Sequence, residues 1–238
     1  MRLKHIVIVP TYNNPKTIKN VVQDLQQHKY VVIVVDDGSD IPIKDSFNLS
    51  EEKNLYFVRH NTNQGKGAAI ISGLHKAKEL GFEYAGSIDG DGQHLASQMY
   101  KLLDDYKNGS IRIGARNFDL LHVPKGSKFG RWFSNFWACW DTGYTITDSL
   151  SGYRIYPISV LNLPIKTKRF DWEMEVLVRH ADAGGLIDEV FIECYYPTAE
   201  ERVSHFKKFG DTMAIVWVHI QILPFKWPSM LMNFFLGK

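Results

Sequence analysis

Two aspartates separated by a single glycine are the residues best suited to chemistry. They are Asp89 and Asp91 in the segment SIDGDGQH, which follows a short apolar run. Carboxylates at this spacing can bind one hard divalent cation, Mg²⁺ or Mn²⁺, and leave positions open for phosphate oxygens. Gln93 could add a carbonyl ligand. The alternative interpretation is a polar turn after a strand, for which DGDG is a good sequence.

A second acidic pair, Asp36 and Asp37, ends the β-branched run 30–35 in the segment VVDDGS. An acid at the end of a buried strand can accept hydrogen bonds from ribose hydroxyls or a base N–H, as in dinucleotide-binding folds. The alternative is a loop aspartate that caps the next helix.

Lys66 lies in the segment NTNQGKGAAI, directly before a helical pattern. A helix N-terminus with a nearby cation favours anions. The segment does not match GxxxxGK[ST], which argues against a P-loop nucleotidase. A helix entry with flexible glycines is the alternative.

Three arginines, Arg116, Arg131 and Arg154, are candidate phosphate clamps, because a guanidinium binds phosphate through two parallel hydrogen bonds. Each lies near glycine or serine, although surface arginines are common. Helical spacing over 129–140 places Ser134 on the same face as Arg131 and the aromatic residues on the other. We expect the aromatic face to pack in the core rather than contact lipid. The aromatic residues are Trp132, Phe133, Phe136, Trp137 and Trp140.

Acidic residues also gather at the predicted start of a helix, in RFDWEMEVLVRH. Asp171, Glu173 and Glu175 suit the helix dipole there. One of them could instead be a general base that deprotonates an acceptor hydroxyl.

The elements that position these residues follow from hydrophobic periodicity. Apolar runs predict strands at 5–9, 30–35, 54–59, 84–88, 111–115 and 186–195, and helical spacing predicts helices at 16–28, 67–80 and 129–140. Strands alternating with helices predict a parallel sheet covered on both faces. Ligands bind beyond the carboxyl ends of such strands, where the polar clusters lie. Residues 117–128 are expected to form a loop.

Composition narrows the class of protein. The 238 residues fit one large domain, and a net charge of +2 without a long basic run argues against nucleic acid as a partner. Cys139 and Cys194 lack zinc or disulfide context, so a reducing cytoplasm is the simpler expectation. No apolar stretch is long enough to span a membrane, and 6–10 is too short for a signal-peptide core. We expect a catalytic domain at 1–210 and an apolar segment at 211–238 that could contact a membrane surface.

The motifs VPTYNN, VVDDGS, NQGKGAA, DGDGQH, GAR, RWFSN, DSLSGYR and FDWEME occur in an order that resembles the family 2 inverting glycosyltransferases of the GT-A fold. Within them the chain looks most like dolichol- or polyprenyl-phosphate sugar transferases. The resemblance implies a Rossmann-like, mostly parallel α/β sheet. It also implies transfer from a UDP- or GDP-sugar to a lipid phosphate, on the cytoplasmic face of a membrane.

The resemblance also implies roles residue by residue. Pro10, Tyr12, Asp36 and Asp37 would hold the nucleoside, with Asn14 and Lys66 on the substrate side as well. Asp89, Asp91 and Gln93 would bind the metal. Arg116, Arg131 and Ser134 would grip the acceptor phosphate, and Asp148, Ser151, Gly152 and Arg154 would form the acceptor side. Glu173 would be the acid of the FDWEM helix, and Arg202 would face the donor diphosphate.

Two departures from the family pattern leave the acceptor open. Gly90 stands where the lipid-phosphate enzymes usually carry alanine, and residues 211–238 are not expected to form the spanning helices that many of those enzymes carry. A lipid phosphate is already anionic and needs no base, whereas a hydroxyl of a glycan or glycolipid would require Asp171 or Glu173. A nucleotidyltransferase would normally show GxGTR after the first strand, and the intact acidic pair argues against a non-catalytic nucleotide-sugar-binding module.

Overall fold

A computed structural model describes residues 5–46, 54–92, 94–107, 109–116 and 125–194 of the chain. Within them, seven strands form one sheet in the order β3-β2-β1-β4-β6-β5-β7. The strands are β1 (Ile6–Thr11), β2 (Val31–Asp36), β3 (Leu55–Arg59), β4 (Tyr84–Ser87), β5 (Ile111–Arg116), β6 (Arg154–Pro157) and β7 (Ile187–Ile192). Gln93, Arg202 and the predicted segment 211–238 lie outside the described residues.

The sheet is mostly parallel. β1 pairs in parallel with β2 and β4, β2 with β3, and β5 with β7. β6 runs antiparallel between β4 and β5. The carboxyl ends of β1, β2, β4 and β5 therefore meet at one edge, and β6 begins at that same edge. All residues of β1 and β2 are buried, as expected of β-branched strands covered on both faces.

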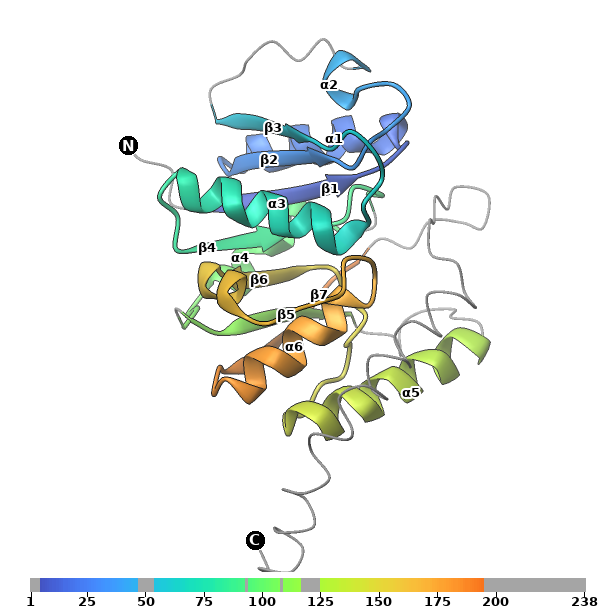
Figure 1. Ribbon diagram of the computed structural model, residues 1–238, viewed down its shortest axis with the longest axis vertical. Coiled ribbons are helices and arrows are strands. Elements are labelled where there is room, and N and C mark those ends of the chain that lie inside the picture. Colours follow the sequence, from blue (N-terminus) through green and yellow to red (C-terminus); the bar gives the residue numbers. More distant parts are fainter. Residues whose placement is uncertain (1–4, 47–53, 93, 108, 117–124, 195–238) are drawn as a thin grey trace, which may run out of the picture.

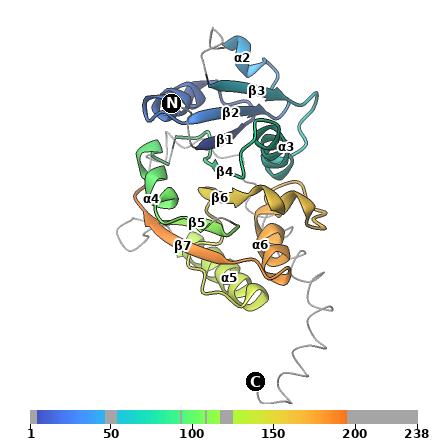
Figure 2. The ribbon, with the colours of Figure 1, turned by 90° about the vertical axis from the view of Figure 1, so that its left-hand side faces the viewer.

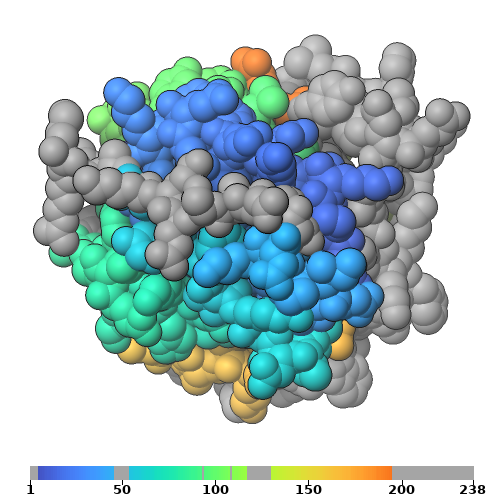
Figure 3. Space-filling model, turned by 90° about the horizontal axis from the view of Figure 1, so that it is seen from above, coloured from blue at the N-terminus to red at the C-terminus, as the bar shows by residue number. Residues whose placement is uncertain are grey.

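Helices cover both faces of this sheet (Figures 1 and 2). α1 and α4 pack on one face, and α3 and α6 pack on the other. The helices are α1 (Pro15–Gln27), α2 (Ile43–Ser46), α3 (Lys66–Glu79), α4 (Met99–Leu103), α5 (Lys125–Thr142) and α6 (Trp172–Asp182), with short 3₁₀ turns at Ala96–Gln98 and Ile158–Asn162. Seen from the end that carries α2 and β3, the near surface is formed mainly by the first half of the chain (Figure 3).

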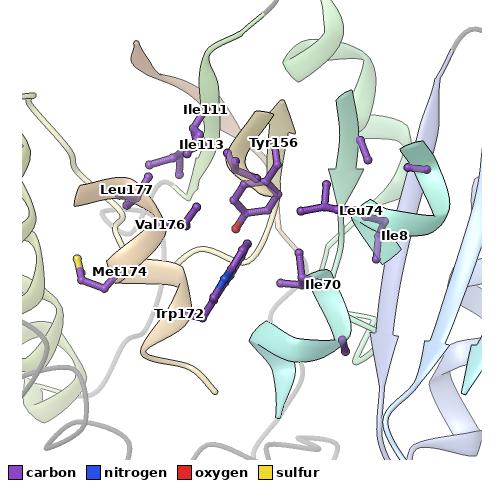
Figure 4. Packing of buried hydrophobic residues seen from close by; sticks show 14 of the residues in the cluster. Ile8, Ile70, Leu74, Ile111, Ile113, Tyr156, Trp172, Met174, Val176 and Leu177 are labelled. Carbon is purple, nitrogen blue, oxygen red and sulfur yellow. The ribbon is translucent and has the colours of Figure 1, made fainter. Parts of the chain in front are cut away.

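The core beneath α3 and α6 is organised around two aromatic rings (Figure 4). Tyr156 and Trp172 lie 5.2 Å apart between ring centroids, beside Ile70 and Leu74 of α3. A Cβ atom on Gly67 would lie 2.3 Å from the Cβ of Trp172, so only glycine lets the two helices come this close. This contact fixes the start of α3 against the start of α6.

Helix α5 corrects two expectations. It begins at Lys125, so the predicted loop is wrong for residues 125–128. The faces of the helix are also reversed. Ser134 and Ala138 are buried, whereas Trp132, Phe136 and Trp140 remain 61%, 48% and 48% exposed. Small residues allow α5 to pack closely on the core, and this leaves the larger aromatic rings on the outer face.

The predicted mostly parallel α/β sheet is confirmed. Strand β6 and the short helices α2 and α4 were not predicted, because four or five residues carry too little periodicity. Cys139 and Cys194 are both free thiols. Among the described residues, no helix combines the length and apolarity that crossing a bilayer would take.

Candidate functional site

The acidic turn after β4 is held by the start of α1. The backbone carbonyl of Gly90 accepts hydrogen bonds from the side-chain amide of Asn14 at 2.9 Å and the hydroxyl of Thr17 at 2.5 Å. Asn14 makes no capping hydrogen bond to its own helix, so its side chain is committed to this turn. Pro10 is buried beside it, with its carbonyl oxygen 3.2 Å from where a Cβ on Gly90 would lie. Asp89 and Asp91 are thereby fixed on either side of Gly90, and both are partly exposed.

Lys66 forms an ion pair with each of two carboxylates at this edge. Its ammonium lies 2.6 Å from Oδ1 of Asp89 and 3.0 Å from Oε1 of Glu173. Burial opposes the charge on Lys66, but the two carboxylates outweigh it and raise the pKa of Lys66. Burial likewise opposes the ionisation of Asp89, and the nearby ammonium overcomes this and lowers the pKa of Asp89. Lys66 and Asp89 are therefore both ionised at neutral pH.

The pair Asp36 and Asp37 organises the loops beside the site. Asp36 accepts hydrogen bonds from the backbone N–H groups of Ser39 and Ile43 and pairs with Arg59. Asp37 accepts from the N–H groups at positions 64 and 65, at 2.9 and 2.8 Å, and lies 2.6 Å from Nδ1 of His60. Both carboxylates are buried, and they shape the loops that follow β2 and β3.

Tyr12 follows β1 directly, and its side chain is partly exposed at the same edge. The next residue, Asn13, has a φ of 48°. Its N–H donates to the hydroxyl of Ser39, and its side-chain oxygen accepts from the N–H of Asp40. The loops after β1 and β2 are therefore joined next to Tyr12.

Arg116 ends β5 and is oriented by a buried carboxylate. Its Nε and Nη2 donate to the two oxygens of Asp148 at 2.6 and 2.9 Å, and its backbone N–H donates to the same group at 3.1 Å. Asp148 has no exposed side-chain surface. Its own N–H and that of Thr147 donate to the carboxylate of Glu189 on β7. The position of the guanidinium is thus fixed by the sheet.

Arg154 is fully buried, and its guanidinium binds backbone carbonyl groups. Its guanidinium donates to the carbonyl oxygens of Ser149, Ser151 and Glu173, each at 2.7 Å. The hydroxyl of Ser151 donates to the carbonyl of Gly114 at 2.7 Å. These two predicted substrate-binding residues therefore join the loop at 148–152 to α6 and to β5.

Helix α5 joins this loop through its buried face. Ser134 and Ser149 lie 3.0 Å apart between their hydroxyl oxygens, and the amide oxygen of Asn135 accepts from the N–H and hydroxyl of Ser149. Arg131, one turn before Asn135, is partly exposed. Arg116, Arg131 and Ser134 are therefore carried by elements that share the loop at 148–152.

His94 closes the side of the site next to β7. Its ring stacks on Tyr153 with centroids 5.0 Å apart, and its Nδ1 lies 3.4 Å from the sulfur of Cys194. Burial lowers the pKa of His94 to about 4, so the ring is neutral at physiological pH. His94 therefore makes its contacts within the protein, with Tyr153 and Cys194.

The sequence profile described as glycosyl transferase family 2 matches residues 6–135, which carry the acidic turn and the residues from Pro10 to Arg131. The chain belongs to this family. This glycosyltransferase is 34% identical over 198 residues to UDP-N-acetylglucosamine–dolichyl-phosphate N-acetylglucosaminyltransferase of Methanococcus voltae, covering 72% of this chain and 78% of that protein. It is 26% identical to undecaprenyl-phosphate mannosyltransferase of Micrococcus luteus, covering 79% and 82%.

Solved structures confirm the predicted GT-A fold. Glucosyl-3-phosphoglycerate synthase of Mycobacterium tuberculosis superposes with a TM-score of 0.71 over 92% of this chain and 80% of that protein, at 16% identity. Another structure of the same enzyme, with a TM-score of 0.70 at 15% identity and coverage of 92% and 78%, contains Mn²⁺ and uridine diphosphate. The shared fold places the strand-end edge described above where Rossmann-like sheets bind ligands.

The acidic turn offers a suitable set of donor atoms for Mg²⁺ or Mn²⁺. Asp89 and Asp91 supply two hard carboxylates, and within the described residues no cluster of three or more histidine, cysteine or acidic side chains could hold an ion. An oxygen-preferring cation bound by these two carboxylates would need further oxygen ligands, which a diphosphate or water can supply. The fixed carbonyl of Gly90 keeps the turn in place for such binding.

Several residues that build the site were not singled out from the sequence. Thr17 and Asn135 are ordinary helix residues in the pattern, and only their long-range hydrogen bonds reveal their roles. His60 could have been found from the sequence, because it directly follows a strand, as the two acidic pairs do. Its contact with Asp37 still depends on loop geometry that periodicity does not give.

Proposed function

We propose that this chain transfers a sugar from a nucleotide-diphosphate sugar to the phosphate of a polyprenyl or dolichyl lipid. The names of its relatives support this acceptor, since those of M. voltae and M. luteus act on dolichyl and undecaprenyl phosphate. A relative in Mycolicibacterium smegmatis, 26% identical, is a polyprenol monophosphomannose synthase.

The observation that carries the proposal is that Glu173 is buried and ion-paired with Lys66. Its carboxylate is 7% exposed and paired at 3.0 Å with Lys66. A general base must reach the acceptor proton and accept it, and an ion-paired buried carboxylate is poorly suited to this. An acceptor phosphate is already anionic, so its oxygen can attack without a base.

The proposed reaction is a displacement at the anomeric carbon with inversion. A phosphate oxygen of the acceptor forms the new bond as the bond to the donor diphosphate breaks, and the nucleoside diphosphate leaves. Arg116 and Arg131 bind the acceptor phosphate and orient it, with Ser134 beside them. A divalent cation at Asp89 and Asp91 would stabilise the charge that develops on the departing diphosphate.

The remaining predicted residues are assigned to the donor and the loops. Pro10, Tyr12 and the loops shaped by Asp36 and Asp37 form the nucleoside side, and Asn14 fixes the acidic turn. Gln93 is proposed as a third metal ligand and Arg202 as a partner of the diphosphate; both assignments rest on the family resemblance. Ser151 and Arg154 support the acceptor loop through the backbone contacts described above.

We also propose that the protein works as a peripheral enzyme on the cytoplasmic face of a membrane. The exposed rings of Trp132, Phe136 and Trp140 support this, because aromatic side chains favour the interface between lipid and water. Arg131 lies on the same helix. A phosphate at the membrane surface would thus meet the proposed acceptor residues beside an apolar face.

The test compares two acceptors that differ only in the phosphate. Transfer of labelled sugar from UDP- and GDP-sugars to dolichyl phosphate or dolichol is measured after solvent extraction, with Mn²⁺ present. Transfer to dolichyl phosphate alone is expected. Asp171 is the remaining candidate base, since it is partly exposed and burial raises its pKa. Asp171→Asn should retain transfer to the phosphate. Transfer to dolichol that is lost in Asp171→Asn would instead identify a hydroxyl-acceptor enzyme.

The donor can be found separately. UDP-, GDP- and dTDP-sugars are screened by thermal shift with and without Mn²⁺, because a ligand that binds the native state raises its melting temperature. We expect one nucleotide class to stabilise the protein, and only when the cation is present.

A further inference from the structure

A buried ion cluster joins the donor and acceptor halves of the site. Its centre is Lys66 at the first residue of α3, which contacts Asp89 after β4 and Glu173 in the first turn of α6. The side chains of Lys66 and Glu173 are 13% and 7% exposed, and that of Asp89 is 27% exposed. The cluster therefore links the proposed metal-binding turn to the helix that supports the acceptor loop.

The acceptor loop closes directly over this cluster. A Cβ atom on Gly152 would lie 2.4 Å from Nζ of Lys66 and 2.6 Å from Oδ2 of Asp89, closer than real atoms approach. The carbonyl of Gly152 accepts a hydrogen bond from the hydroxyl of Ser87 at 2.7 Å, which holds the loop in this position. The cluster is thus enclosed by backbone on the acceptor side.

We propose that Lys66 is a positioning residue whose charge sets the affinity of Asp89 for a divalent cation. Its ammonium lies 2.6 Å from one oxygen of Asp89, so it opposes a second cation at that carboxylate. Glu173 acts in the opposite direction, because it partly neutralises the ammonium that lies beside Asp89. This inference rests on the proposed function in one respect, namely that Asp89 and Asp91 bind a metal.

The charges of the cluster make the proposal quantitative. Two carboxylates and one ammonium give the wild-type cluster a net charge of −1. Lys66→Met makes this −2, Glu173→Gln makes it zero, and the double variant Lys66→Met/Glu173→Gln returns it to −1. If charge controls cation binding, affinity follows this order and the double variant resembles the wild type.

The test titrates the full chain and these three variants with Mn²⁺ alone, using the EPR signal of free Mn²⁺ at pH 7.5. We expect Lys66→Met to bind Mn²⁺ about tenfold more tightly, Glu173→Gln to bind several-fold more weakly, and the double variant to return to within about twofold of the wild type. Lys76→Met is the matched control. Lys76 lies on the same helix and pairs with Glu79 at 2.9 Å, but Glu79 is 65% exposed. Its affinity should not change.

Other outcomes overturn the proposal. Equal affinity in Lys66→Met and wild type would show that Lys66 does not act on the cation, as would weaker binding in Lys66→Met. A double variant that binds Mn²⁺ more weakly than either single variant would indicate a purely structural role. If the wild type binds Mn²⁺ no more strongly than Asp91→Asn does, the metal does not bind at this turn. If Lys66→Met does not fold, Glu173→Gln still tests the proposal, because unchanged or tighter Mn²⁺ binding by this variant would contradict it.

Activity supplies the second readout. In Lys66→Met we expect kcat to fall at least about tenfold while the half-saturating Mn²⁺ concentration also falls, because Asp89 loses the contact that orients it. A loss of stability alone would lower kcat without lowering the half-saturating Mn²⁺ concentration. If the protein fails to glycosylate dolichyl phosphate but the EPR order holds, the proposed acceptor is wrong and the role of Lys66 stands.

Discussion

Arg116 and Asp148 form a bidentate ion pair at the carboxyl edge of the sheet. The carboxylate is fully buried, and the guanidinium is partly exposed. The pair fixes a cation where β5 ends, beside the loop that covers the ion cluster. An arginine held in this way loses little side-chain entropy when it binds an anion.

The first prediction concerns Asp148. Asp148→Asn leaves the partly buried guanidinium of Arg116 without its counter-charge, and breaking such a pair costs about 3 kcal/mol of unfolding free energy. It should also raise the KM for the lipid phosphate more than it changes the KM for the donor. Urea denaturation and steady-state kinetics measure the two effects.

A control for Asp148 lies on the same strand. Arg112 on β5 pairs with Asp188 on β7 at 2.7 Å, near the opposite end of both strands. Asp188→Asn should destabilise the protein less, since Asp188 is 35% exposed, and should leave the KM for the acceptor unchanged. An equal rise in that KM for both variants would mean that Arg116 has no special part in acceptor binding.

The second prediction concerns Asp91. Asp91→Asn should lower kcat about 100-fold, because a cation that stabilises the leaving diphosphate is worth several kcal/mol in the transition state. The unfolding free energy should change little, since Asp91 is partly exposed. Assays with and without chelator supply the comparison, and Asp45→Asn on α2 is the control for charge. Full activity of Asp91→Asn in the presence of chelator would contradict metal-assisted departure.

The sequence predicted which strand ends carry the polar residues better than it predicted how those residues pair. Strand-end polar residues such as Asp36 and Asp89 were placed correctly, because parallel strands bring their carboxyl ends to one edge. The pairing of Lys66 with Asp89 and Glu173 could not be predicted, since it depends on three segments far apart in the chain. Arg154 was expected at a phosphate, yet burial and three carbonyl partners commit it to the backbone.

The same limit applies to the fold. β1 and β2 were predicted from runs rich in β-branched residues, whereas β6 is four residues long and ends at a proline. Helical spacing separated the aromatic rings of α5 from Ser134 and Ala138, but the expectation that the aromatic face packs inward was wrong. The small residues Ser134 and Ala138 decide this, because they let the helix approach the core.

The third prediction concerns the pH dependence of stability through His180. The ring lies at the end of α6, where Nε2 is 3.2 Å from the carbonyl of Leu186, and burial lowers its pKa. A lowered pKa means that the unfolded state takes up the proton more readily. The stabilising contribution is therefore complete above about pH 6.5 and is lost as the pH falls through the folded-state value.

Urea denaturation at pH 8 and pH 5.5 tests this assignment. The wild type should lose unfolding free energy on acidification, and His180→Gln should lose less. His94 also has a lowered pKa, so only the difference between the two proteins reports on His180. Parallel losses in both proteins would assign the acid sensitivity to other groups.

The fourth prediction concerns the exposed rings of α5. Trp132, Phe136 and Trp140 follow one another along the helix, with ring centroids 6.1 and 6.2 Å apart between successive pairs, and they line a shallow hollow with Asn135 and Cys139. Replacing all three rings by serine should weaken binding to anionic vesicles at least about tenfold, the equivalent of partly burying one aromatic side chain. Flotation of the full chain with vesicles measures the bound fraction.

A control triple variant distinguishes the exposed rings of α5 from exposed apolar residues elsewhere on the surface. Ile41, Tyr100 and Phe191 are also large and exposed, at 68%, 57% and 65%, but they lie on the loop before α2, on α4 and on β7. Their replacement by serine should leave vesicle binding unchanged. If both triple variants float like the wild type while melting at the same temperature, α5 does not contact the membrane. The lipid acceptor would then have to reach Arg116 and Arg131 from another side of the molecule.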